Sequence, residues 1–98
     1  MATTTVRTPQ FKRDLKQLKR KRADLSELEA VLSLIEENTP SARETLMTNH
    51  GMHRIRGTYP GSNECHLGTK RDDLVIVWDT KKDSVVLRRT GPHDKVFR

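Results

Sequence analysis

The feature that most constrains the fold is a run of five apolar residues, from Leu74 to Trp78. Because every position is apolar, both faces of this run must be covered, which is typical of a central β-strand. A second apolar segment at residues 84–90 follows a short polar link and predicts a neighbouring strand. Gly91-Pro92 should end that strand, since proline cannot donate a ladder hydrogen bond, and a short helical or irregular tail should follow. The last third of the chain therefore predicts the centre of a small β-sheet.

Three shorter segments, rich in β-branched residues or alternating in polarity, predict the remaining strands. They lie at residues 3–7, 53–58 and 64–69. The central strand is expected to begin at Asp73. Side chains alternate between the two faces of a strand, so we expect Cys65 to face the core while His66 faces away from it. Trp78 is expected to pack in the core as well.

Two amphipathic segments between the first strand and the later ones predict helices. Thr8 is a suitable N-cap for the first helix, with Pro9 at its first helical position. Asp24 is expected to cap the second helix, and Asn38-Thr39-Pro40 to end it. The apolar stripes are Phe11, Leu15 and Leu18 in the first helix, and Leu25, Leu28, Val31, Leu32 and Ile35 in the second. Residues 41–51 show no clear period, so we expect a loop with at most a short extended piece.

This order of elements predicts an α+β fold. Two N-terminal helices should pack on a small, mainly antiparallel sheet, in the order β-α-α-β-β-β. The 98 residues are expected to form one domain, residues 1–98, because neither half could bury enough apolar surface alone. Since only 33% of the residues are hydrophobic, the core must be small.

Charge and cysteine content narrow the choice of partners and compartment. The formal charge of +6 predicts a surface that attracts polyanions, with nucleic acid the first choice and an acidic protein the second. Lys12 and Lys16 belong to a basic face of the first helix, which is either simply solvated or a footprint for such a partner. A single cysteine excludes an internal disulfide and a cysteine-based zinc site. No apolar run approaches the ~20 residues that span a bilayer, and no secretory signal is evident, so we expect a cytoplasmic protein without a membrane partner.

Motifs for phosphate-cradling loops, paired metal-binding carboxylates and activated nucleophiles are all missing from the sequence. Its four histidines are His50, His53, His66 and His93. They fall on separate expected elements, unlike the i, i+4 pairs that bind zinc on a helix, so we expect neither a metal nor another cofactor. Histidine, arginine and aspartate in a basic domain suit metal-free RNA cleavage. There the ribose 2′-hydroxyl attacks the adjacent phosphate, and the protein supplies a base, an acid and cations.

Several motifs follow one another along nearly the whole chain. They are the basic first helix, Glu37-Asn38-Thr39-Pro40, Asn49-His50, Glu64-Cys65-His66, Asp73 before the apolar strand, and Arg89-Thr90-Gly91-Pro92-His93 with Phe97 four residues later. In order and spacing, this set resembles the YafQ branch of the RelE/ParE toxin superfamily, the toxins of type II toxin–antitoxin systems. The C-terminal Arg-Thr-Gly-x-His-x-x-x-Phe pattern is its most specific part.

The resemblance implies a RelE-like, microbial-RNase-type fold and a ribosome-dependent mRNA endonuclease. Such a toxin inhibits translation by cutting messages in the ribosomal A site, and the cut is expected to leave a 2′,3′-cyclic phosphate and a 5′-hydroxyl. The implied partners are the ribosome with its mRNA and a cognate antitoxin. That antitoxin is expected to be acidic and DNA-binding, so the toxin would reach operator DNA only through it.

The resemblance also implies roles for individual residues. The catalytic residues that it implies are His50, His66, Asp73 and His93, with Arg89 and Phe97 binding the substrate. Apart from the resemblance, we also expect Arg88, Lys12 and Lys16 to bind substrate. His93 would be the general acid, while His50 and His66 would share the base and orienting work with Asp73. Arg89 would steady the phosphate. Phe97 would stack on a base, a contact worth ~1–3 kcal/mol in single-stranded RNA recognition.

Two other interpretations are open at this point. A basic module that binds RNA or the ribosome without catalysis would use the same lysines and arginines and keep its histidines as structural residues. An inactive toxin homologue could act as a co-repressor. His53 has no counterpart in the resemblance and is expected to be an ordinary surface residue. Asn63 and the long link at residues 68–72 depart from the family pattern, and these departures concern loop geometry and codon preference.

Overall fold

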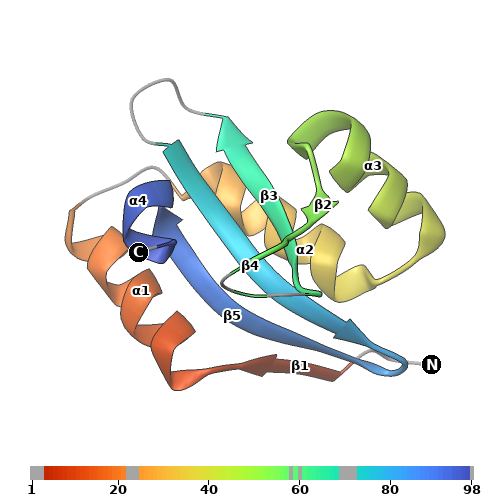
Figure 1. Cartoon of the computed structure of the whole chain (residues 1–98), viewed down its shortest axis with the longest axis horizontal. Coiled ribbons are helices and arrows are strands. Elements are labelled where there is room, and N and C mark those ends of the chain that lie inside the picture. The colour runs from red at the N-terminus through yellow and green to blue at the C-terminus, as the bar shows by residue number, and fades with distance from the viewer. Residues whose placement is uncertain (1–3, 22–24, 58, 60, 69–72, 98) are drawn as a thin grey trace.

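The computed structural model describes residues 4–21, 25–57, 59, 61–68 and 73–97, which form helices on a five-stranded sheet (Figure 1). In chain order the elements are β1 (Thr4–Arg7), α1 (Pro9–Arg20), α2 (Ser26–Glu37), α3 (Pro40–His50), β2 (His53–Arg54), β3 (Asn63–Gly68), β4 (Asp73–Lys81), β5 (Ser84–Pro92) and α4 (His93–Val96). The strands lie in the order β1-β5-β4-β3-β2. β1 runs parallel to β5 and all other neighbours are antiparallel. The expected α+β class and mainly antiparallel sheet are confirmed.

The two apolar runs form the strands β4 and β5, as expected, and both are longer than the runs themselves. β4 pairs with β3 on one side and with β5 on the other. The register of β4 against β5 shifts between Val77, opposite Arg89, and Trp78, opposite Leu87. Arg88 therefore has no partner across the ladder, which is the pattern of a β-bulge.

Helix α1 begins as the sequence indicated. The Thr8 hydroxyl oxygen accepts a hydrogen bond from the backbone N–H of Phe11 at 3.1 Å, with Pro9 in the first turn. The same hydroxyl donates to the backbone carbonyl of Arg88 at 3.1 Å. A single residue thus caps the helix and fastens its start to β5.

Helix α2 also ends where expected, at Asn38, whose backbone is left-handed with a φ of 52°. Asparagine tolerates this conformation better than most residues, which suits it to a helix C-terminus. At the other end Leu25 occupies the N-cap position, while the expected cap, Asp24, lies outside the described residues.

The loop expected at residues 41–51 is wrong, because Pro40–His50 forms helix α3. Thr39 caps this helix by accepting a hydrogen bond from the backbone N–H of Ala42 at 3.1 Å. Only Ala42 and Leu46 are buried along it, so its apolar stripe is too thin to produce a helical period in the sequence. The cap, rather than the periodicity, was the informative feature here.

The strands after α3 also differ in extent from their expected bounds. β2 contains only His53–Arg54 rather than residues 53–58, because the chain leaves the sheet after Arg54. β5 continues through Gly91-Pro92. Proline is tolerated there because β1 pairs with β5 only as far as Leu87, so β1 needs no N–H donor at that position. The observed order is β-α-α-α-β-β-β-β-α, which has α3, one further strand and α4 in addition to the expected β-α-α-β-β-β.

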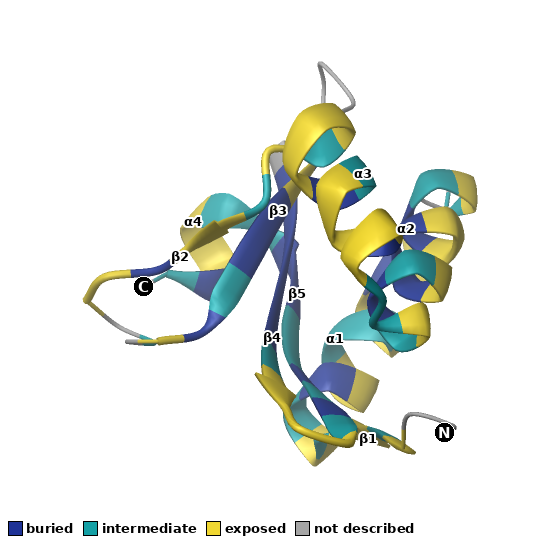
Figure 2. Cartoon of the chain, turned by 90° about the vertical axis from the view of Figure 1, so that its right-hand side faces the viewer, coloured by how far each residue is buried: buried dark blue, intermediate teal, exposed yellow. Residues whose placement is uncertain are grey.

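The two faces of the sheet are covered differently, as the nearly edge-on view in Figure 2 shows. Helices α1, α2 and α3 lie on one face and enclose the main core. That core contains Phe11, Leu18, Leu28, Val31, Leu32, Ile35, Leu46, Cys65, Leu67, Leu74, Ile76, Trp78, Val85 and Leu87. The expected core positions of Cys65 and Trp78 are confirmed.

The opposite face carries the short helix α4, on the side toward which the edge strand β2 curves (Figure 2). A small apolar cluster of Ile55, Val75, Val77 and Val96 lies there, with Tyr59 and Phe97 packed against it. Because α4 is the only helix on this face among the described residues, we call it the open face. No helix in the described part of the chain is long and apolar enough to cross a bilayer.

Candidate active site

Three histidines form a row on the open face of the sheet. His53 comes from β2, His66 from β3 and His93 from the first residue of α4. The ring centroids of His53 and His66 are 6.1 Å apart, and those of His66 and His93 are 6.3 Å apart. The interplanar angles are 19° and 9°, so the rings are nearly parallel. All three side chains are about half exposed, which leaves them accessible to a substrate.

The strand register explains why these side chains meet. Cys65 points into the helix-covered core, so its neighbours Glu64 and His66 must point to the open face. His53 lies opposite Glu64 in the antiparallel pairing of β2 with β3. Residues directly opposite one another across a ladder are close enough for their side chains to interact.

Glu64 lies beneath the row and is only 4% exposed. Its Oε1 atom is 2.9 Å from Nε2 of His53 and 3.7 Å from Nε2 of His66. Its other oxygen, Oε2, is buried and has no hydrogen-bond partner among the described residues. A buried carboxylate is costly unless a cation or hydrogen-bond donor compensates it, so this position needs an explanation beyond packing.

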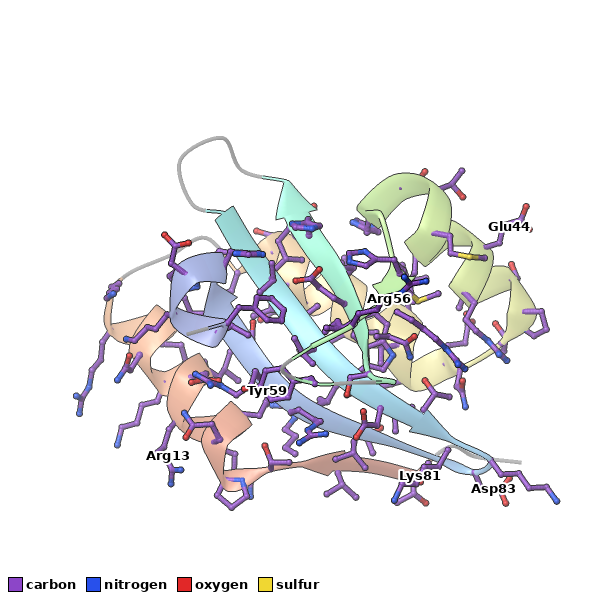
Figure 3. All side chains as sticks on the ribbon, in the orientation of Figure 1. Arg13, Glu44, Arg56, Tyr59, Lys81 and Asp83 are labelled. Carbon is purple, nitrogen blue, oxygen red and sulfur yellow. The ribbon has the colours of Figure 1, made fainter. Side chains whose placement is uncertain are left out.

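Aromatic side chains flank the row at its α4 end. The Phe97 ring lies 4.7 Å from the His93 ring, centroid to centroid, and 6.1 Å from the Tyr59 ring, which it meets edge to face. The Tyr59 hydroxyl donates to the backbone carbonyl of Val96 at 3.5 Å. Figure 3 shows Tyr59 in front of the sheet, on the same side as α4. These contacts fix Phe97 beside the histidines.

The bulge in β5 brings two consecutive arginines to the same aromatic ring. In a regular strand Arg88 and Arg89 would point to opposite faces, but the bulge changes their direction. The Arg88 guanidinium lies over the Tyr59 ring, 5.2 Å from its centroid, and Arg89 donates to the Tyr59 hydroxyl at 3.2 Å. Arg88 also pairs with Asp79 at 3.3 Å.

Arg89 is held more firmly than Arg88 because Asp14, on α1, accepts from it. The Arg89 Nε–H donates to Oδ2 of Asp14 at 2.8 Å, and the same oxygen accepts from the backbone N–H of Thr90 at 3.1 Å. The hydrogen bond to Asp14 is the main reason that the pKa of Arg89 is raised above its ordinary value. Arg89 is therefore a fixed cation beside Tyr59.

A cavity of about 370 Å³ opens next to the row. Its lining residues are His53, Arg54, Ile55, Arg56, Gly57, Glu64, His93 and Phe97. Two arginines, two histidines and an aromatic ring around one buried carboxylate can bind a phosphate, move protons and stack on a base. A larger groove of about 570 Å³, between α2, α3 and the sheet, is lined by a mixture of apolar, polar and basic side chains, and His53 is its one histidine among the described residues.

Comparison with known proteins decides the family. The model of the YafQ toxins, described as bacterial toxins of type II toxin–antitoxin systems, matches residues 3–98. The chain belongs to the YafQ family. No curated protein sequence matches it.

Solved structures agree with this assignment. The crystal structure of YafQ from Escherichia coli strain BL21(DE3) matches with a TM-score of 0.83 and 19% identity, covering 98% of this chain and 99% of that one. The E. coli DinJ–YafQ toxin–antitoxin complex matches with a TM-score of 0.79 and 18% identity over 100% of both chains. A conserved hypothetical protein from Helicobacter pylori is 30% identical, with a TM-score of 0.62 and coverage of 97% and 99%.

Among the residues expected from the YafQ resemblance, the structure brings His66, His93 and Phe97 together. His50, at the end of α3, contacts α2: its Nδ1 faces Oε1 of Glu27 at 3.5 Å, and its side chain is only 16% exposed. Asp73 begins β4 opposite Gly68, but its side chain lies outside the described part of the chain. The catalytic roles expected for His50 and Asp73 stay predictions.

The expected substrate-binding residues also separate into groups. Arg88 and Arg89 contact Tyr59 near the aromatic end of the row. Lys12 and Lys16 are exposed on α1. In the described part of the YafQ-like chain, no group of three or more His, Cys, Asp and Glu residues is arranged to hold a metal ion.

Four residues of the site were not expected from the sequence. They are His53, Glu64, Tyr59 and Asp14. The alternation of Glu64 with Cys65 could have placed its side chain beside His66. His53 was expected to be a surface residue, and this is confirmed, since its side chain is 52% exposed; its contact with Glu64 at 2.9 Å was not expected.

Proposed function

We propose that this YafQ-family chain is a ribosome-dependent mRNA endonuclease that inhibits translation by cutting mRNA in the ribosomal A site. The observation that carries the proposal is the row of three nearly parallel imidazoles beside a buried carboxylate and an aromatic ring. Imidazole can donate and accept protons near neutral pH, and two such groups are what strand cleavage by the adjacent 2′-hydroxyl requires.

In this reaction the 2′-oxygen attacks the phosphorus while a base removes its proton. The bond from phosphorus to the 5′-oxygen breaks, and an acid protonates that oxygen. The products are a 2′,3′-cyclic phosphate and a 5′-hydroxyl. His93, at the exposed start of α4, is assigned as the acid, and His66, in the middle of the row, as the base. We also propose His50 and Asp73 as catalytic residues, and this part of the proposal rests on the resemblance alone.

Cations and rings around the row would bind the RNA. Arg89 is charged at any working pH and Asp14 holds it in place, so it can stabilise the negative charge that grows on the phosphate in the transition state. Arg88 adds a second cation at the same ring. Phe97 offers a face for a base next to His93. Lys12 and Lys16 on α1 would add contacts to phosphates of the message or the ribosome.

A cognate antitoxin completes the proposal. The family is defined by toxin–antitoxin pairs, and one of the matching structures is the E. coli DinJ–YafQ complex. The net charge of +6 favours an acidic partner here as well. Such an antitoxin would neutralise the toxin and connect it to operator DNA through its own DNA-binding part.

Induced expression in a bacterial host tests the proposal. Primer extension on translated messages should show codon-phased cuts with the wild-type protein and none with His93→Ala. Glu44→Ala, an exposed change on α3 away from the row, serves as the matched control and should cut normally. Soluble wild-type protein that arrests no growth and makes no cuts would overturn the proposed activity.

A further inference from the structure

His53 makes two polar contacts, one through each ring nitrogen. Nδ1 lies 3.0 Å from the backbone carbonyl of Gly51, and Nε2 lies 2.9 Å from Oε1 of Glu64. A carbonyl oxygen can only accept, so Nδ1 must carry a proton. Nε2 is the ring atom that faces the carboxylate of Glu64. Turning the ring over would place carbon atoms against both oxygens.

The carbonyl that holds His53 is itself fixed by the end of α3. Gly51 is the C-cap of α3, with a left-handed φ of 63° that glycine adopts without strain. Its backbone N–H, like that of Met52, bonds to the carbonyl of Leu46. His53 is therefore a half-exposed side chain with a rigid anchor on one side and a buried carboxylate on the other.

Glu64 links this anchor to the middle of the histidine row. The oxygen that contacts His53 also lies 3.7 Å from Nε2 of His66, while Oε2 has no hydrogen-bond partner among the described residues. A carboxylate next to an imidazole stabilises the imidazolium that forms when the ring takes up a proton, and it also holds the ring in one orientation. Without His53, the carboxylate would lose its close partner and could rotate away from His66.

We propose that His53 is a positioning residue that acts through Glu64 to orient His66 and to stabilise its protonated form during cleavage. This inference rests on the proposed function and deepens it, because it adds a support for the base that the family resemblance does not supply. The other charged or titratable side chains around this cavity are Arg54 and Arg56 after α3 and His93 from α4.

A double-mutant cycle read by NMR tests the linkage without any nuclease assay. In long-range ¹H–¹⁵N spectra of the labelled full chain, His53→Gln should shift the ring nitrogens of His66. The same change made in the Glu64→Gln background should cause no further shift, because the effect passes through the carboxylate. Glu44→Gln, an exposed change on α3 that does not line this cavity, is the control and should leave His66 unchanged. Equal shifts in both backgrounds, or none in either, would overturn the proposal.

Cleavage kinetics test the consequence. On ribosomes programmed with a message whose cut site has been mapped, His53→Gln and Glu64→Gln should each lower kcat on the order of 10²-fold with little change in KM. The double variant should be no slower than the Glu64 variant alone. If His53→Gln had the same kcat as the wild type, the proposed positioning role of His53 would be wrong. A wild-type protein that does not cut would refute the proposed function, while the NMR cycle would still decide whether His53 acts on His66.

Discussion

The face of the sheet under α1, α2 and α3 and the face that carries α4 differ in how they are covered and in how polar their side chains are. The first is closed, and its buried side chains are apolar. The second combines a small apolar cluster with a buried carboxylate, three half-exposed histidines and several arginines. The first face lowers the free energy of the folded state by removing apolar surface from water. The second gives up part of that gain to keep polar groups in reach of a ligand.

Because the two faces share the same strands, the closed face also determines the geometry of the open one. Along β3, Cys65 packs under the helices while Glu64 and His66 point the other way. Along β4, Ile76 belongs to the main core, and its neighbours Val75 and Val77 belong to the small cluster. A site built on rigid strands keeps its side chains in place better than one built on loops. Stability and activity should therefore respond to different substitutions.

The largest expected effect separates activity from stability on the open face. His66→Ala should lower the cleavage rate by about 10²–10⁴-fold, because it removes the assigned base. Since the side chain is half exposed, the free energy of unfolding should change by no more than roughly 0.5 kcal/mol. Ribosomal cleavage and urea denaturation on the same preparation give both numbers. A loss of stability in proportion to the loss of activity would mean that His66 is a structural residue.

The converse is expected on the closed face. Phe11 is fully buried in the main core, so Phe11→Ala should cost about 3–5 kcal/mol of unfolding free energy through lost contacts and the cavity left behind. Met47 is 54% exposed on α3, and Met47→Ala should cost less than about 0.5 kcal/mol. Urea titrations of the two variants provide the comparison. Equal costs would contradict the assignment of a single closed core.

Substituting Asp14 tests whether a residue on the closed face also supports the site on the open face. Asp14 lies on α1, yet it holds Arg89, which contacts Tyr59 on the open face. Asp14→Ala should cost about 1.5–3 kcal/mol, because it removes a buried acceptor from a charged donor and from the backbone N–H of Thr90. Arg88→Ala, which breaks a more exposed ion pair, should cost at most about 1 kcal/mol.

The Asp14 variant should also cut RNA more slowly, since Arg89 would no longer be held beside Tyr59. Melting curves and cleavage rates measured together would show whether one residue serves both faces. Unchanged cleavage in a destabilised Asp14→Ala protein would confine Asp14 to a structural role.

Sequence alone was sufficient for features that depend on neighbours along the chain. The apolar run at β4, the Thr8 cap of α1 and the Asn38 end of α2 are all local, and each was expected. Helix α3 was missed because two buried residues do not make a visible stripe. Its Thr39 cap followed by proline was the local evidence available.

The site was less predictable because its geometry depends on register and on long-range contacts. His66, His93 and Phe97 were expected from the family resemblance, and they do lie together. The contact of His53 with Glu64 depends on the pairing of β2 with β3. A strand of two residues is too short to be predicted from the sequence. Asp14 and Arg89 are 75 residues apart, and only the packing of α1 beside β5 brings them into contact.

The smallest expected effect concerns Cys65, which lies on the closed face directly between the two site residues of β3. Burial, followed by the charges of Glu64 and Glu27, raises the pKa of this thiol from 9.0 to about 12. At pH values between these two pKa values, the thiol is deprotonated in the unfolded chain and protonated in the folded chain. The contribution of the thiol to the free energy of unfolding is therefore fully present below about pH 9 and falls as the pH rises. Near pH 10 the loss should be roughly 1 kcal/mol relative to pH 8. Urea denaturation at both pH values measures the change in the free energy of unfolding. The wild type should lose about this much more than Cys65→Ala does, since the two proteins share every other titrating group. Parallel changes in the two proteins would mean that the thiol is not sealed from water, and that the closed face is less closed than its packing indicates.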